Sequence, residues 1–162
     1  LACLDAKTGE KLWEHDYVRE FGAPVPKWGY SESLLVDGGR VIGAPNGPKA
    51  AVVAFDAATG RVAWKADLGP TGDGGGYATP VKATVNGVPM VVVLLGQKAG
   101  IVGLDPETGK LLWQYTKAAL GGIAQIPTPI VRGDKVWFST SYAGGSALLQ
   151  LLPAGGKAFT VK

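Results

Sequence analysis

Short apolar runs bounded by glycine and aspartate dominate the chain. Residues 50–55 (AAVVAF) and 100–104 (GIVGL) are almost entirely apolar, whereas residues 61–68 (RVAWKADL) and 110–115 (KLLWQY) mix apolar with polar positions. Short runs of this kind, rich in β-branched and aromatic residues, are typical of β-strands. The pattern therefore predicts an all-β chain, and it predicts a helix nowhere.

Further apolar segments are paired around glycine-containing turns. Asn86-Gly87 lies between residues 81–85 (VKATV) and 90–95 (MVVVLL). Asn-Gly is a strong hairpin signal because both residues tolerate the positive φ angles that a tight turn requires. The same strand–turn–strand arrangement is predicted with Asp37-Gly38-Gly39 between residues 34–36 and 40–44, and with Gly133-Asp134 between residues 129–132 and 135–140.

One phrase occurs three times: LDAKTGEKLW at residues 4–13, FDAATGRVAW at 55–64 and LDPETGKLLW at 104–113. Each copy fits Asp-x-x-Thr-Gly-x-x-x-Trp, and the spacing between copies is 51 and then 49 residues. A regular period of this length indicates repeated supersecondary units. Together with the hairpins, it predicts four-stranded antiparallel sheets of about 40–50 residues, the size of a propeller blade.

Each residue type in the phrase has a physical role in the predicted turn. The Asp accepts hydrogen bonds from backbone N–H groups ahead of it, the Thr hydroxyl closes the turn, and the Gly supplies a positive φ. A Trp buries roughly 150–250 Å², more than one small sheet can cover, so we expect it at the contact between neighbouring units. The structural motif residues are Asp5, Thr8, Gly9, Trp13, Asp56, Thr59, Gly60, Trp64, Asp105, Thr108, Gly109 and Trp113.

These residues match a known repeat. Residues 54–64 fit Ala-x-Asp-x-x-Thr-Gly-x-x-x-Trp at every fixed position, and the small residues Cys3 and Gly103 replace the Ala in the other two copies. The chain therefore resembles the PQQ-like, or quinoprotein-type, β-propeller family, whose signature is this tryptophan-docking motif. The resemblance implies that Trp13, Trp64 and Trp113 occupy equivalent sites, each stacked between its own small residue and the turn of the next blade.

The resemblance also divides residues 1–162 into about three and a half blades. We expect the end of a blade at residues 1–17, full blades at 33–68 and 79–115, and a degenerate blade at 128–162, which ends in LLPAGGKAFTVK without the motif. Closed propellers have typically 4–8 blades. We therefore expect a fragment of a propeller of about seven or eight blades, whose first partners are the remaining blades of the parent chain.

Composition and charge exclude several classes of function. The net charge is +3, but the basic residues are scattered, so no nucleic-acid partner is expected. No run of 18 apolar residues occurs, so no membrane span is expected. The single cysteine, Cys3, cannot form an internal disulfide. The family resemblance implies a periplasmic or secreted protein.

Candidate binding residues are expected on loops held by the rigid blades. These loops lie opposite the Asp-x-x-Thr-Gly turns, between blades and between the second and third strands of each blade. The polar and aromatic candidates are Lys27, Trp28, Tyr30, Asp73, Tyr77, Gln97, Lys98, Gln125 and Tyr142. The segment Glu14-His15-Asp16 is expected to be a solvated strand end, because a lone His forms neither a metal cluster nor a triad.

Two functions from different classes follow from the resemblance. The first, which we favour, is a non-catalytic binding or assembly scaffold that presents inter-blade loops to a protein partner. The alternative is part of a quinoprotein alcohol or sugar dehydrogenase that depends on pyrroloquinoline quinone (PQQ) and Ca²⁺. The segment shows neither adjacent cysteines nor Cys-x-x-Cys-His, and no Asp or Glu can be assigned as a base or metal ligand. PQQ and Ca²⁺ are therefore expected only if the complete protein is a quinoprotein.

Overall fold

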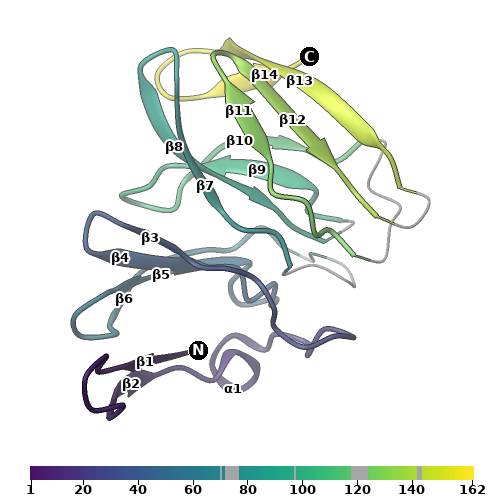
Figure 1. Ribbon diagram of the computed structural model, residues 1–162. Helices are drawn as coiled ribbons and strands as arrows, with labels where there is room; N and C mark the ends of the chain where they lie inside the picture. Colours follow the sequence, from purple (N-terminus) through teal and green to yellow (C-terminus); the bar gives the residue numbers. More distant parts are fainter. Residues whose placement is uncertain (70, 72–76, 97, 118–123, 142–143) are drawn as a thin grey trace.

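The computed structural model describes residues 1–69, 71, 77–96, 98–117, 124–141 and 144–162. In this part of the chain, three four-stranded antiparallel sheets and one two-stranded sheet follow one another in sequence order, as Figure 1 shows. Every strand is hydrogen-bonded to its neighbour in sequence within its sheet. The prediction of an all-β fold built from propeller blades is therefore confirmed.

Each sheet lies within one of the predicted blade segments. The two-stranded sheet contains β1 (Ala2–Leu4) and β2 (Lys11–Glu14). The second sheet contains β3 (Leu35–Asp37), β4 (Arg40–Gly43), β5 (Val52–Asp56) and β6 (Val62–Ala66). The third contains β7 (Val81–Val85), β8 (Val88–Leu94), β9 (Ile101–Leu104) and β10 (Leu111–Tyr115), and the fourth contains β11 (Ile130–Arg132), β12 (Lys135–Ser139), β13 (Ser146–Pro153) and β14 (Phe159–Val161).

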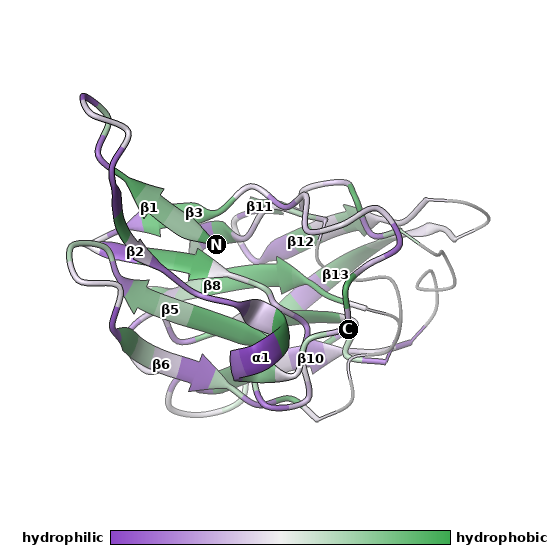
Figure 2. Cartoon of the chain, turned by 90° about the horizontal axis from the view of Figure 1, so that it is seen from below, coloured by the Kyte–Doolittle hydropathy of each residue, from purple (hydrophilic) through white to green (hydrophobic). Residues whose placement is uncertain are grey.

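The hydrophobic core lies between the blades. Met90, Val92 and Leu94 of β8 belong to one cluster with Phe138 of β12, whereas the alternate residues of β8 belong to a cluster with Val52 of β5. Side chains alternate between the two faces of a strand. A central strand such as β8 is therefore apolar on both faces, and Figure 2 shows β5 and β8 as continuous hydrophobic arrows.

One short helix corrects the sequence-based expectation. Helix α1 (Tyr17–Phe21) follows β2, and the Asp16 side chain accepts hydrogen bonds from the backbone N–H groups of Val18 and Arg19 at its start. Gly22 ends it with φ 66°. Five residues are too few to show a helical period, so the pattern gave no signal. The helix is stabilised by burial of Tyr17 and Phe21 against the next blade.

Candidate functional site

The three Asp-x-x-Thr-Gly turns are built as the residue types predict. The Asp5 carboxylate accepts from the backbone N–H groups of Lys7 and Thr8, each at 2.8 Å, and these hydrogen bonds hold its pKa below the usual value. The Asp56 carboxylate accepts from the Thr59 hydroxyl at 2.7 Å and from the Thr59 N–H at 2.8 Å. Closed in this way, each turn offers rigid backbone carbonyls to its neighbour.

Two of the tryptophans contact the turn of the next blade. Trp13 Nε1 donates to the Ala57 carbonyl at 3.1 Å, and Trp64 Nε1 donates to the Pro106 carbonyl at 2.9 Å. Each indole lies directly over the turn glycine, because a Cβ on Gly60 would come within 2.7 Å of Trp13. The same two contacts thus link both pairs of consecutive blades: a hydrogen bond from the indole N–H and packing of the indole over the turn glycine.

Trp113 differs from the other two, so the expected equivalence holds only in part. It is buried and belongs to the cluster shared with the fourth sheet, but its Nε1 donates to Met90 Sδ at 3.3 Å. The turn after β13 lacks the Asp-x-x-Thr-Gly residues. Instead, Lys157 Nζ reaches back to the Asp105 carboxylate at 2.5 Å. An ion pair therefore joins two blades where the regular indole contact is missing.

A second inter-blade contact was not anticipated from the sequence. Arg40, at the start of β4, donates from one guanidinium nitrogen to the Pro106 carbonyl at 2.6 Å and pairs with Glu107 through another at 2.7 Å. Pro106 thus accepts from both Arg40 and Trp64. The only sequence signal for this contact was an arginine beside a turn. Arginines are common beside turns, so the signal did not predict the contact.

The candidate loop residues separate into several groups. The Trp28 and Tyr77 rings meet edge to face with centroids 5.9 Å apart, and Lys27 Nζ lies 5.0 Å from the Trp28 ring centroid. Trp28 is 47% exposed, whereas Tyr77 is buried. The structure thus brings two inter-blade loops together at these residues.

The remaining candidates lie in other surroundings. Lys98 is exposed, but Gln125 is fully buried, so its side chain is not part of the expected surface. Tyr30 donates to the Pro24 carbonyl at 3.2 Å and lines a separate hollow. Asp73, Gln97 and Tyr142 lie outside the described residues.

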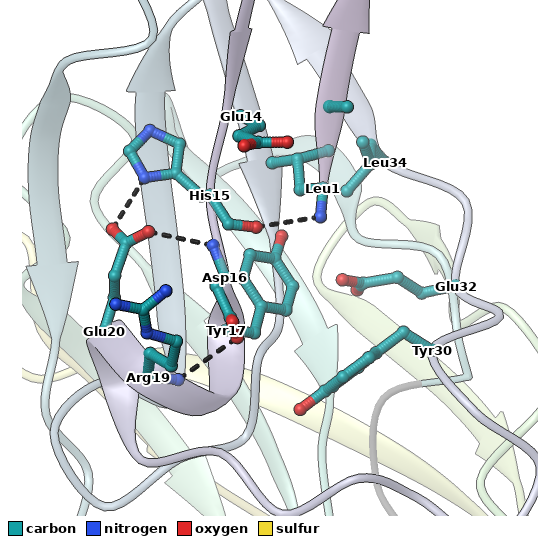
Figure 3. Close-up of a pocket in the computed structure, with 11 residues that line it drawn as sticks. Leu1, Glu14, His15, Asp16, Tyr17, Arg19, Glu20, Tyr30, Glu32 and Leu34 are labelled. Carbon is teal, nitrogen blue, oxygen red and sulfur yellow. Dashed lines mark hydrogen bonds and ion pairs between the residues drawn. The ribbon is translucent and has the colours of Figure 1, made fainter.

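This hollow, of about 950 Å³, lies between the two-stranded sheet, helix α1 and the segment that leads into β3. Figure 3 shows the carboxylates of Glu14, Glu20 and Glu32 around it, with the Tyr17 and Tyr30 rings between them. Glu14 pairs with Lys11, and Glu20 pairs with His15, both at 2.7 Å. No motif predicted this site, because its residues come from two strands, a short helix and a loop that share no sequence pattern.

Tyr17 and Glu32 both have unused hydrogen-bonding capacity in the hollow. The Tyr17 hydroxyl is buried and has no hydrogen-bond partner among the described residues. Both Glu32 carboxylate oxygens accept from the Ala44 N–H at 2.9 Å, and burial raises the pKa of Glu32 to about 7. A Cβ at Gly43 would come 2.5 Å from Tyr17 Oη and 3.1 Å from Glu32 Oε1, so both groups lie over the same glycine.

His15 corrects the expectation of a solvated strand end. Its ring stacks on Phe55 with centroids 4.3 Å apart. Its Nε2 lies 2.6 Å from the Gly60 carbonyl, and its Nδ1 lies 2.7 Å from the Glu20 carboxylate. Both partners are acceptors, so both ring nitrogens donate when the two bonds form together. His15 therefore connects helix α1 to the turn of the next blade.

Comparison with known proteins decides the family. A family model of PQQ-type repeats, described as "Outer membrane protein assembly factor BamB", matches residues 1–158. The chain belongs to this family. Among solved structures, the crystal structure of BamB from Moraxella catarrhalis aligns with a TM-score of 0.50 over 95% of this chain, at 19% sequence identity. No curated protein matches the chain.

The relation to BamB is one of fold. At 19% identity, the alignment supports the architecture alone, and this chain spans 40% of the length of the Moraxella protein. Within the part of the chain that the structure describes, no helix has the length and apolarity that a membrane crossing requires. The family and the blades are thus established for this BamB-like chain, and its activity is a matter for proposal.

A quinone and calcium site would need specific donors. Ca²⁺ takes 6–8 oxygen ligands, usually with several carboxylates. Among the described residues, no group of three or more His, Cys, Asp and Glu side chains is placed to hold a metal ion. The described residues therefore do not form the set of oxygen donors that Ca²⁺ requires.

Proposed function

We propose that this chain forms part of a non-catalytic scaffold in the periplasm that presents its inter-blade loops to a protein partner. The family model carries the description of an outer membrane protein assembly factor, which supports both the role and the location. Loops on rigid blades are suited to binding because the scaffold removes much of the entropy cost of ordering them.

The exposed side chain of Trp28 is the observation that carries the proposal. Tryptophan is enriched among residues that dominate binding energy, especially where a large ring is already held in place. Trp28 packs against the buried Tyr77 on one side, yet 47% of its surface remains exposed. Lys27, over the ring, adds a positive charge at the same place. The partner surface is therefore expected to combine an apolar pocket with an acidic rim.

Further blades of the same kind are a second proposed partner. Ile130, Trp137 and Leu148 are directly opposite one another across β11, β12 and β13, and all three are exposed. The other face of this sheet packs on the third sheet. A row of apolar side chains in register is the surface that an adjoining blade would cover, as β8 covers β5 inside the described array.

Site-specific photo-crosslinking tests the scaffold role. A photoreactive residue at position 28 should capture one protein partner in the producing cells, and the same residue at Lys7, in an Asp-x-x-Thr-Gly turn, should not. With the purified partner, Trp28→Ala should weaken binding by about thirtyfold, the loss typical of a dominant interface residue, and Lys7→Ala should leave it unchanged. Equal affinities for the two variants would contradict the proposed role of the loop face.

A further inference from the structure

The hollow beside helix α1 has an excess of acidic groups, and only one of its carboxylates lacks a cation or a capping role. Glu14 pairs with Lys11, Glu20 pairs with His15, and Asp16 caps α1. Glu32 accepts from one backbone N–H and makes no ion pair with any described residue. A carboxylate that accepts one N–H group retains capacity for further donors.

The Tyr17 hydroxyl supplies an independent indication. Tyr17 is 5% exposed, and its hydroxyl has no partner among the described residues. A buried polar atom without a hydrogen bond destabilises the fold, so such atoms are uncommon without a ligand or water nearby. Figure 3 shows this hydroxyl pointing up toward Leu1, with the Glu32 carboxylate directed toward the same ring.

We propose that this hollow binds an alkylammonium group, held by the Glu32 carboxylate and the Tyr17 hydroxyl. An ammonium has three donors and no acceptor, so it matches a carboxylate that receives a single N–H group and a phenol oxygen that receives none. The half-exposed Tyr30 ring stands edge to face with Tyr17, 5.4 Å between centroids, and adds an aromatic wall of the kind that attracts cations.

Other ligand classes fit less well. An anion would meet four carboxylates in the lining, against the cationic Arg19 and the Leu1 amino group; the carboxylates are those of Glu14, Asp16, Glu20 and Glu32. A divalent metal ion needs more oxygen ligands than one available carboxylate and one phenol provide. An apolar ligand would leave both polar groups without partners. A lysine side chain and a free amine present the same head group, and the test below distinguishes the two sources.

Binding should depend on pH through Glu32. Burial raises the pKa of Glu32 to about 7, so the empty site is largely protonated at pH 6 and largely ionised at pH 7.5. The charged and titratable groups around the hollow are Glu14, His15, Asp16, Tyr17, Arg19, Glu20, Tyr30 and the Leu1 amino group. Neither phenol ionises in this range, because burial raises the pKa of both. The ammonium requires ionised Glu32, so its affinity should fall by roughly eightfold from pH 7.5 to pH 6.

Calorimetric titration of the protein with Nα-acetyl-lysine-methylamide and with spermidine tests the site. The matched uncharged probe, Nα-acetyl-norleucine-methylamide, should not bind. Glu32→Gln keeps an acceptor for the Ala44 N–H but removes the charge, and it should weaken ammonium binding at least about tenfold. Tyr17→Phe should weaken it several-fold, whereas Glu10→Gln, which removes an exposed carboxylate outside the hollow, should leave it unchanged.

Each outcome has a definite meaning. Tighter binding of the lysine derivative would identify a protein side chain as the source of the ammonium, and tighter binding of spermidine would identify a free polyamine. Absence of binding at millimolar probe, or equal affinity in Glu32→Gln and the unaltered protein, would overturn the proposal. The crosslinking result at position 28 is independent of all these outcomes, since Trp28 does not line the hollow.

Discussion

Gly9, Gly60 and Gly109 occupy the same position in three copies of one turn, yet they have different surroundings. Their φ angles are 75°, 73° and 71°, so each backbone needs the left-handed region. A Cβ at Gly109 would come 2.5 Å from Trp64, and one at Gly60 would strike Trp13, but one at Gly9 would meet no atom within 4 Å. The same residue type thus serves backbone conformation in one copy, and conformation together with indole packing in the other two.

This difference gives a matched pair of variants. Gly9→Ala should cost about 1–2 kcal/mol in the free energy of unfolding, because only the left-handed conformation opposes it. Gly109→Ala should cost about 1–3 kcal/mol more, because the added methyl also displaces the Trp64 indole. Urea denaturation of both variants measures the two losses. Equal losses would show that the indole contact adds no constraint.

At the scale of elements, each blade is joined to the next through its turns. Trp64 from β6 and Arg40 from β4 converge on the Pro106 carbonyl in the turn between β9 and β10. One backbone atom therefore receives two donors from the preceding blade. The ion pair of Lys157 with Asp105 joins the last two sheets from the opposite direction, where the motif is absent.

Truncation of a docked tryptophan should be far more costly than truncation of an exposed one. Trp64 is buried, whereas Trp137, on β12, is 37% exposed. Trp64→Ala should lower the free energy of unfolding by about 3–5 kcal/mol through the cavity and the lost hydrogen bond. Trp137→Ala should lower it by less than about 1 kcal/mol in a chain where no partner covers that face. A shift in melting temperature for Trp64→Ala within experimental error would exclude the docking role.

At the scale of the whole molecule, consecutive blades share their cores. Two hydrophobic clusters combine residues from neighbouring sheets, and β8 contributes to both. A third cluster joins helix α1 to β5. Repeat proteins of this kind derive stability from the interfaces between units as much as from the units themselves. The shared cores therefore connect the blades into one packed array, which carries the loop of Trp28 and the acidic hollow.

A quinone titration separates the scaffold from the dehydrogenase alternative. Addition of PQQ with Ca²⁺ to the purified protein should produce no saturable quenching of tryptophan fluorescence, because the described residues offer no calcium donor set. A PQQ-dependent dehydrogenase, titrated in parallel, serves as the positive control. Saturable, calcium-dependent quenching at micromolar PQQ would instead favour the dehydrogenase.

The local pattern of residues was sufficient to predict the strands, the turns and the repeat. Asn-Gly turns, alternating strands and three copies of one motif depend on neighbours close in sequence, so a single chain displays them directly. The predicted hairpin around Asn86-Gly87 appears as β7 and β8. The Asp-x-x-Thr-Gly hydrogen bonds also follow from residue type, because donor and acceptor lie within three residues of each other.

Contacts between residues that are far apart in sequence became visible only in the folded chain. His15 reaches Gly60 and Lys157 reaches Asp105 across 45 and 52 residues, and neither pair has a motif. Helix α1 packs beside β4 and β5, and this packing brings together Tyr17, Glu32 and Gly43. The helix has only five residues, too few to show the periodicity that would predict it. The amino-acid pattern was therefore enough to predict the repeated blade, because the interactions that form a blade are local. The acidic hollow could not be predicted in this way, because its side chains become buried, and its polar atoms lack partners, only once the blades have packed.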